Sequence, residues 1–385
     1  MSAGGNIAVG SSCDKRPGQH RASERGAMHN LTKRHTPPGT APGTLAGRHD
    51  GEEGKLHFTL VEYDETKCEV SFEVPIDECR SHLSTPERTW IDVAGRASAG
   101  MLKTLGEKFN LHPLALEDVF HGNQRSKLDI FDDQAFLVMN DPGWVDGRLR
   151  SRQVSIFFGA NHVISFHDHE EDIFAPIRER LQQAGARLRT RRIDYLVYAL
   201  VDLVIDRKFP LLQQFSDSVE KLEDETLEGA TPQTLRQIHD LRRSLYTFHS
   251  VQWAEREMVH AMMRAEVTLL SAETRTYLRD CVDHSIAVLD LIESYREMCN
   301  SLMELYMMGT SNRLNEVMKL LAIITTIFMP LGFIAAVYGM NFNTEAAGGL
   351  NMPELNWSFG YPMVLGVMAL VVIGMVLWFR RKGWF

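Results

Sequence analysis

The sequence has little of what marks several common classes of protein. It contains only five cysteines in 385 residues, an odd number whose spacing fits neither a zinc ribbon nor a CxxC pair, so we expect reduced thiols in a cytosolic compartment. No apolar stretch follows Met1, which argues against a cleaved secretory signal. Basic residues do not dominate: 41 Lys and Arg stand against 50 Asp and Glu, a net charge of −9 that argues against a nucleic-acid binder but permits cation binding.

The motifs of common enzymes are also missing. The sequence has no GxSxG, no P-loop, no HExxH and no paired Cys/His set, which argues against an enzyme and against nucleotide binding. Apolar residues make up 44% of the chain and charged residues 24%, and the mean hydropathy is slightly negative, at −0.19. These values exclude a bundle of many membrane helices, whereas two spans would barely change them.

The sequence before residue 173 divides into two regions. Residues 1–54 are rich in Gly, Ser, Pro, His and Arg, and we expect this extension to be disordered. Residues 55–172 alternate short strands with turn signals at 141–143 and 159–161, which predicts an α/β domain. The expected strands are 69–74, 89–93, 127–131, 134–140, 153–158 and 162–166, and the expected helices are 97–109 and 114–120.

Residues 173–319 are expected to be helical almost throughout. No proline occurs between Pro232 and Pro330, and the only glycine there is Gly309, so very long helices are predicted. Apolar residues at spacings of three and four indicate a buried stripe, and a coiled-coil stalk by itself would explain it. The stripe consists of Leu278, Val282, Ile286, Leu289, Ile292, Cys299, Leu302 and Tyr306.

Two uncharged segments, 320–338 and 361–379, lie near the C-terminal end. Each has 19 residues, enough to cross about 30 Å of hydrocarbon as a helix. A buried core helix is the alternative for either segment. Two such segments in succession are more typical of a membrane hairpin, so we predict a first and a second transmembrane helix with these bounds.

Charge orients this hairpin. The connecting loop, 339–360, has no Lys or Arg and carries Glu345 and Glu354, whereas the tail 380–385 is basic. The positive-inside rule therefore places both termini in the cytosol and the loop outside. The basic residues at the inner membrane interface are Lys319, Arg380, Arg381 and Lys382.

A single hairpin cannot enclose a pore, so conduction requires several copies around an axis. The first span continues the long charged helix and is the better candidate for lining the path, because the second is uniformly apolar. No carboxylate occurs between Lys319 and Glu345, which favours a cation that keeps its hydration shell. The pore candidates are Asn315, Met318, Leu321, Thr325, Met329, Gly332 and Ala336.

The members of this set differ in what they suggest. Met318, Leu321 and Met329 would form apolar constrictions that close by dewetting. Taken alone, Met and Leu at these positions are more typical of plain contacts between membrane helices. Asn341 would add a ring of amide oxygens at the mouth.

Short motifs around both spans resemble those of one family, the CorA magnesium channels. The similarity covers roughly residues 56–385, and the YGMN motif lies at the outer end of the first span, as in that family. The matching letters are YGMN at 338–341, MPEL at 352–355, NEVMK at 315–319, IFMPL at 327–331, FRRKGW at 379–384, LHPL at 111–114 and LED at 116–118.

The resemblance implies a funnel-shaped homopentamer in the lipid bilayer of a bacterial cytoplasmic (inner) membrane. Its cytosolic part would be an α/β/α domain with very long stalk helices, followed by the two-helix transmembrane hairpin. The implied activity is Mg²⁺ influx driven by the membrane potential, with Co²⁺ and Ni²⁺ as further ions and without nucleotide or organic cofactor. Gly339, Met340 and Asn341 would form the selectivity filter.

The same resemblance implies regulation at the subunit interface. Asp118 of one protomer and Asp280 of its neighbour, with Glu117 close by, would hold intracellular Mg²⁺. Facing carboxylates repel one another unless a divalent cation lies between them, so bound Mg²⁺ would hold the pore closed.

Two other functions stay open. A Zn²⁺ transporter like ZntB shares this architecture, and neither motif fixes the ion. A membrane-anchored sensor or scaffold that does not conduct is the second alternative. The stretch 167–172 has the composition of a metal site, but contiguous residues at a strand end point in different directions. The acidic run at 220–228 is typical of a solvated helix face.

Overall fold

The structure is a computed structural model of the chain. It describes residues 39–45, 56–76, 79, 87–145, 147–169, 171–229, 231–264, 268–341, 352, 355 and 357–384. Most of the predicted extension 1–54, and the loop acids Glu345 and Glu354, lie outside the described residues. Residues 39–45 differ from the expectation of disorder, because they form a turn whose backbone is hydrogen-bonded to the α/β domain.

A mixed sheet forms the centre of this domain and confirms the α/β prediction. Its strand order is β2-β1-β3-β7-β6-β5-β4, in which β3 and β7 are parallel and the other neighbours antiparallel. Sequence reasoning did not single out β1, although its buried and exposed residues largely alternate. The strands are β1 (His57–Tyr63), β2 (Cys68–Phe72), β3 (Arg88–Ala94), β4 (Lys127–Ile130), β5 (Ala135–Val145), β6 (Arg148–Phe158) and β7 (His162–His167).

Strand β5 continues through the turn predicted at 141–143. Pro142 pairs with Ser151 in the hairpin between β5 and β6. Strand β4 pairs with β5 only as far as Val138, so Pro142 lies where β5 has a single neighbour, a position that tolerates a residue without an N–H. The prediction of a turn at this place was therefore wrong.

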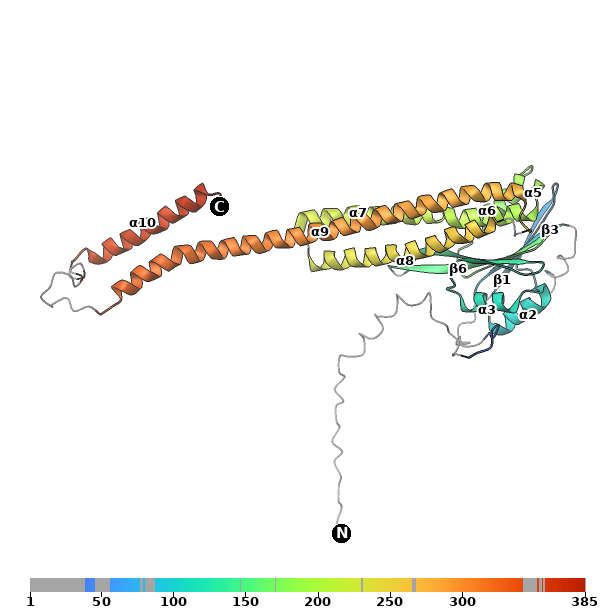
Figure 1. Ribbon diagram of the computed structural model, residues 1–385, viewed down its shortest axis with the longest axis horizontal. Coiled ribbons are helices and arrows are strands. Elements are labelled where there is room, and N and C mark those ends of the chain that lie inside the picture. Colours follow the sequence, from blue (N-terminus) through green and yellow to red (C-terminus); the bar gives the residue numbers. More distant parts are fainter. Residues whose placement is uncertain are drawn as a thin grey trace, which may run out of the picture. The chain divides into compact units, whose positions relative to one another are not determined.

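Helices cover both faces of the sheet (Figure 1). Helices α2 (Ala99–Phe109) and α3 (Pro113–His121) lie on one face and pack with strand residues such as Phe136 and Phe157. Helices from the later part of the chain cover the other face and pack with Leu137 and Phe158. Successive strand residues thus serve opposite cores, as the alternation of a pleated strand requires.

Long helices make up the rest of the chain, as the lack of proline and glycine predicts. Contacts divide the chain into two compact units, 1–220 with 239–299 and 221–238 with 300–385. Helix α9 has 67 residues, belongs to both units and continues through Pro330. The remaining helices are α4 (Ala175–Gln182), α5 (Arg187–Thr190), α6 (Ile193–Asp206), α7 (Lys208–Gly229), α8 (Pro232–Met262), α9 (Ala272–Tyr338) and α10 (Gly360–Arg381).

The apolar stripe of α9 packs largely as predicted. Leu278 and Val282 pack in the core that the later helices share with the sheet, and Leu289 and Ile292 are buried as well. Ile286 is an exception, because 39% of it is exposed in the single chain. The prediction that Ile286 belongs to the buried stripe is therefore wrong for the single chain.

Candidate functional site

The GMN tripeptide closes the C-terminal end of α9. Gly339 donates its N–H to the carbonyl of Ala335 at 2.9 Å, and Met340 donates to Val337 at 3.3 Å. A Cβ at Gly339 would lie 3.2 Å from the Ala335 oxygen, so a larger residue would disturb this last turn. Asn341 follows with its side chain exposed. The sequence therefore places its amide at the end of the apolar helix.

The predicted pore residues form one exposed strip along α9. Met318, Leu321 and Met329 are 56%, 55% and 68% exposed, and the polar and small members of the set are exposed as well. Ile323 is buried, at 6% exposure, in the same unit as the buried Phe379 of α10. At 3.6 residues per turn, Ile323 lies roughly 150° around α9 from the centre of the strip.

Both C-terminal helices are long and apolar enough to cross a membrane. The most apolar 18-residue window of each has a mean hydropathy of 2.4, and only 6% of it is buried in the chain. Basic residues lie at the ends: Arg380 and Arg381 finish α10, and Lys319 Nζ lies 3.4 Å from the carbonyl of Gly383. Such exposed apolar surface requires lipid or further protein to cover it.

Glu117 and Asp118 are consecutive residues of α3. This helix begins with Pro113, whose missing N–H needs no partner there, and His112 Nδ1 accepts the N–H of Leu114 at 3.3 Å. The helix ends where Gly122 donates its N–H to the carbonyl of Asp118 at 3.1 Å. The last turn of α3 therefore carries both predicted regulatory carboxylates.

Both carboxylates have partners within the chain. Oε2 of Glu117 accepts the backbone N–H of Gly43 at 2.7 Å. Oδ2 of Asp118 lies 2.8 Å from Nζ of Lys127, which is also 2.5 Å from Oδ2 of Asp129. Burial raises the pKa of Asp118 above its ordinary value, against the opposing effect of the Lys127 ammonium. Neither partner was identified from the sequence.

Asp280 lies on α9 beside a second acidic group. Its side chain is 62% exposed, and Oδ2 is 3.9 Å from Nε2 of His284. Asp202 and Asp206 of α6 join His284, with one ligand atom of each within 4.8 Å of the others. Burial, followed by the charge of Asp206, raises the pKa of Asp202. This set has the chemistry of a divalent cation site.

Sequence reasoning missed this second group. Its signal was the four-residue spacing within each helix, from Asp202 to Asp206 and from Asp280 to His284. The spacing places each pair on one helix face but does not reveal that the two faces meet.

Within one chain, the predicted regulatory residues are divided between two layers. Glu117 and Asp118 belong to α3 on one face of the sheet, and Asp280 belongs to α9 on the other (Figure 1). The sheet lies between these layers. The single chain therefore does not bring Asp118 and Asp280 to one cation.

The two histidines of the polar stretch 167–172, in which residue 170 lies outside the described residues, do not converge on one point. His167 Nε2 lies 3.5 Å from Oδ2 of Asp92 on β3, whereas His169 Nε2 lies 2.9 Å from Oδ2 of Asp141 on β5. The two histidines thus pair with carboxylates of different strands, in agreement with the expectation that neighbouring residues here diverge.

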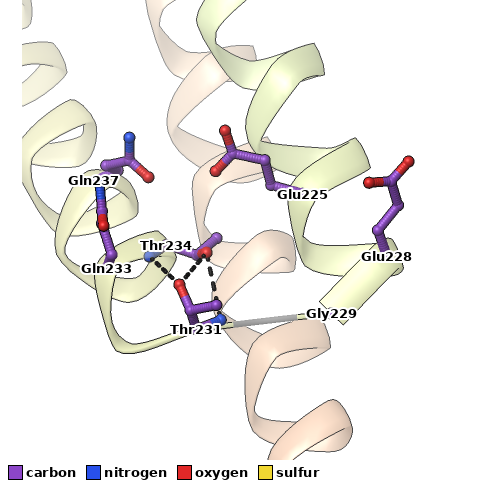
Figure 2. Close-up of a pocket in the computed structure, with 7 residues that line it drawn as sticks. All are labelled: Glu225, Glu228, Gly229, Thr231, Gln233, Thr234 and Gln237. Carbon is purple, nitrogen blue, oxygen red and sulfur yellow. Dashed lines mark hydrogen bonds between the residues drawn. The ribbon is translucent and has the colours of Figure 1, made fainter.

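A shallow pocket lies between the ends of α7 and α8 (Figure 2). The hydroxyls of Thr231 and Thr234 are 3.0 Å apart at the start of α8, and Glu225 and Glu228 come from the acidic run of α7. The lining residues are Glu225, Glu228, Gly229, Thr231, Gln233, Thr234 and Gln237. This polar lining accords with a solvated helix end.

An α/β domain combined with two exposed apolar helices, one of them the end of the 67-residue α9, indicates a membrane protein with a large domain outside the membrane. The chain belongs to the family described as CorA-like Mg2+ transporter protein, which matches residues 87–381. It is 37% identical over 355 residues to the cobalt/magnesium transport protein CorA of Thermotoga maritima, covering 91% of this chain and 97% of that one.

Solved structures share the fold. The complete structure of the CorA magnesium transporter from Methanocaldococcus jannaschii is similar with a TM-score of 0.72 at 21% identity, covering 85% of this chain and 98% of that one. The ZntB cytoplasmic domain from Vibrio parahaemolyticus is similar with a TM-score of 0.50 at 11% identity, covering 66% and 99%. At these identities the likeness concerns the fold alone.

Membership confirms the resemblance seen in the motifs. Members of this family are membrane transporters for divalent cations, not enzymes, and Mg²⁺ is the ion that the family transports.

Proposed function

We propose that this chain forms a homopentameric, funnel-shaped channel through which Mg²⁺ enters the cytosol, driven by the membrane potential. Co²⁺ and Ni²⁺ are the further ions we expect it to pass. The membrane would be the inner membrane of a bacterium, with both termini in the cytosol. The first span, 320–338, would line the pore and the second, 361–379, would face lipid.

The observation that carries this proposal is the exposed strip of α9. The strip lies opposite Ile323, the one residue of 320–338 that is buried, and it leads to the exposed Asn341. The single chain leaves most of this apolar helix uncovered, so lipid or other copies must cover it. The strip carries the polar and small residues Asn315, Thr325 and Gly332, so it is the face we expect to meet other copies around an axis.

The composition of the strip favours a hydrated ion. Between Lys319 and Asn341 the helix has no carboxylate, so the polar ligands it offers are neutral oxygens such as that of Thr325. Mg²⁺ loses its waters reluctantly and would pass neutral groups within its first hydration shell. Gly339, Met340 and Asn341 would then select the hydrated ion at the mouth.

Regulation would use the carboxylates that one chain keeps apart. Asp118 and Glu117 of one protomer would face Asp280 of the next, where Asp202 and Asp206 add negative charge. High cytosolic Mg²⁺ would bridge these groups and stabilise the closed state. Loss of the ion would leave repulsion between them and shift the population toward the open state.

Flux measurements test the channel directly. Purified protein is placed in liposomes containing a Mg²⁺-sensitive dye, and an inside-negative potential is applied. We expect rapid Mg²⁺ entry that hexaammine cobalt, a mimic of hydrated Mg²⁺, blocks and that Asn341→Ala abolishes. Asn312→Ala is the matched control, because Asn312 is an exposed amide of α9 that lies roughly 130° around the helix from the centre of the strip.

The alternatives give different results in the same vesicles. Entry of Zn²⁺ that depends on a proton gradient, without Mg²⁺ entry, would favour a transporter like ZntB. No entry of any divalent cation into vesicles that hold the folded oligomer would leave a membrane-anchored sensor or scaffold and contradict the channel.

A further inference from the structure

Lys127 places an ammonium group against a predicted regulatory carboxylate. It is the first residue of β4, at the edge of the sheet, and follows α3 after a short loop. Its Nζ lies 2.8 Å from Oδ2 of Asp118 and 2.5 Å from Oδ2 of Asp129. The side chain of Asp118 is 17% exposed, whereas those of Lys127 and Asp129 are each 38% exposed.

The charges of this group are unbalanced. Two carboxylates share one ammonium, which leaves a net charge of −1. Burial by itself lowers the pKa of Lys127, but the two carboxylates outweigh it and raise that pKa, so the ammonium stays charged. It therefore sits, as a single positive charge, on Oδ2 of Asp118, an oxygen that a divalent cation could also bind.

We propose that Lys127 is a tethered competitor of the regulatory divalent cation at Asp118. The inference rests on the regulation proposed above. Mg²⁺ that takes Oδ2 of Asp118 as a ligand displaces the ammonium, which raises the Mg²⁺ concentration needed to fill the site. The flexible stem lets Nζ leave Asp118 while it keeps its contact with Asp129, so displacement does not strand a charge.

Removal of the ammonium tests the competition. Lys127→Met keeps most of the volume of the stem and leaves Asp118 free for the ion. We expect the Mg²⁺ concentration that gives half-maximal closure to fall roughly five-fold, which corresponds to about 1 kcal/mol. Closure is read as protection of the full-length protein from chymotrypsin and as inhibition of Mg²⁺ flux in liposomes.

Two comparisons separate displacement from a general change of charge. Lys103→Met removes an exposed ammonium from α2, in the same layer of the domain, and should leave the Mg²⁺ midpoint within two-fold of wild type. Asp129→Asn removes the second partner of Lys127, so the ammonium rests on Asp118 alone and the midpoint should rise. In the Lys127→Met background, Asp129→Asn should have a much smaller effect.

Each outcome bears on a different proposition. A Mg²⁺-dependent wild type whose midpoint Lys127→Met leaves unchanged, or shifts no more than Lys103→Met does, overturns the competition alone. A wild type without any Mg²⁺-dependent protection or inhibition overturns the regulatory site itself, and the competition with it. Thermal unfolding without Mg²⁺ checks the fold, and Lys127→Gln replaces the Met variant if that protein does not fold.

Discussion

Gly43 donates its backbone N–H to Oε2 of Glu117 at 2.7 Å, across 74 residues of sequence. The donor lies in a turn in which Pro42 precedes Gly43, and Gly43 has a φ of +81°, as the third position of a type II turn requires. Leu45 then packs against the core under α2 and α3. A segment before the α/β domain is thus held against the proposed regulatory carboxylates.

Gly43→Val should release this segment. A β-branched residue is strained at positive φ, and a Cβ at Gly43 would lie 3.2 Å from Cβ of Pro113. We expect the free energy of unfolding to fall by about 1–2 kcal/mol. Denaturant titration of the full chain in detergent measures it. Gly100→Ala is the control, since a Cβ there meets open space and should not destabilise the protein. Equal stability of both variants would contradict the account.

Asp280→Lys should make closure insensitive to Mg²⁺. The introduced ammonium would take the place of the ion opposite Asp118 of the neighbouring protomer and remove the repulsion that opens the pore. We therefore expect a persistently closed channel whose small residual flux does not change with internal Mg²⁺. Currents recorded over a range of internal Mg²⁺ check this, with Asp283→Lys on the same helix as the comparison. Unchanged inhibition by Mg²⁺ in Asp280→Lys would count against the site.

Met318→Ser should weaken the proposed apolar constriction. Met318 is 56% exposed on the strip, and in a pentamer five copies would surround the axis. A hydroxyl stabilises water in a narrow pore, so dewetting would no longer close it completely. We expect a leak of Mg²⁺ into vesicles at saturating internal Mg²⁺. Val317→Ser changes a residue that is also exposed, 58%, but off the strip, and should not leak. Identical behaviour of the two variants would argue against a gate at Met318.

The fold could be predicted where local pattern decides it. Strand β6 ends at Phe158 and β7 begins at His162, so the turn at 159–161 lies where the sequence predicts it. The absence of helix breakers likewise predicts the long helices. The turn expected at 141–143 failed, because the tolerance of Pro142 depends on which strand lies beside β5. That is a property of the sheet and not of the local sequence.

The candidate site also has features that the sequence predicts and features that it does not. The strip of α9 can be chosen from spacing, and the GMN motif from its resemblance to a family motif. The contacts of Glu117 with Gly43 and of Asp118 with Lys127 cannot, because they depend on how a turn and an edge strand pack beside α3. A carboxylate whose partner the sequence does not reveal can therefore have one in the folded chain.

The first unit also contains a buried ion pair with a predictable pH dependence. Lys208 and Glu255 are fully buried, Nζ of Lys208 contacts Oε1 of Glu255, and it also donates to the carbonyl of Val204 at 3.2 Å. Burial raises the pKa of Glu255 above its ordinary value of 4.5, and the Lys208 ammonium opposes that rise. Lys208→Met removes the opposing charge, so the pKa of Glu255 should rise further.

The sign of the effect follows from proton binding. An acid whose folded-state pKa is raised binds its proton more tightly in the folded chain, so its contribution favours folding below about pH 4.5. That contribution is lost as the pH rises from there through the folded-state pKa. At neutral pH, Lys208→Met should be destabilised by about 3–5 kcal/mol, and the loss should be smaller at pH 5. Denaturant titrations at the two pH values measure it.

A second substitution isolates the cause. Lys208→Met combined with Glu255→Leu removes both charges, so stability should recover and the added dependence on pH should disappear, because an apolar pair of similar volume can replace a buried ion pair. If Lys208→Met instead became more stable with rising pH, Glu255 would not be the titrating group. If the double variant stayed as unstable as the single one, packing around Lys208, and not the stranded carboxylate, would account for the loss.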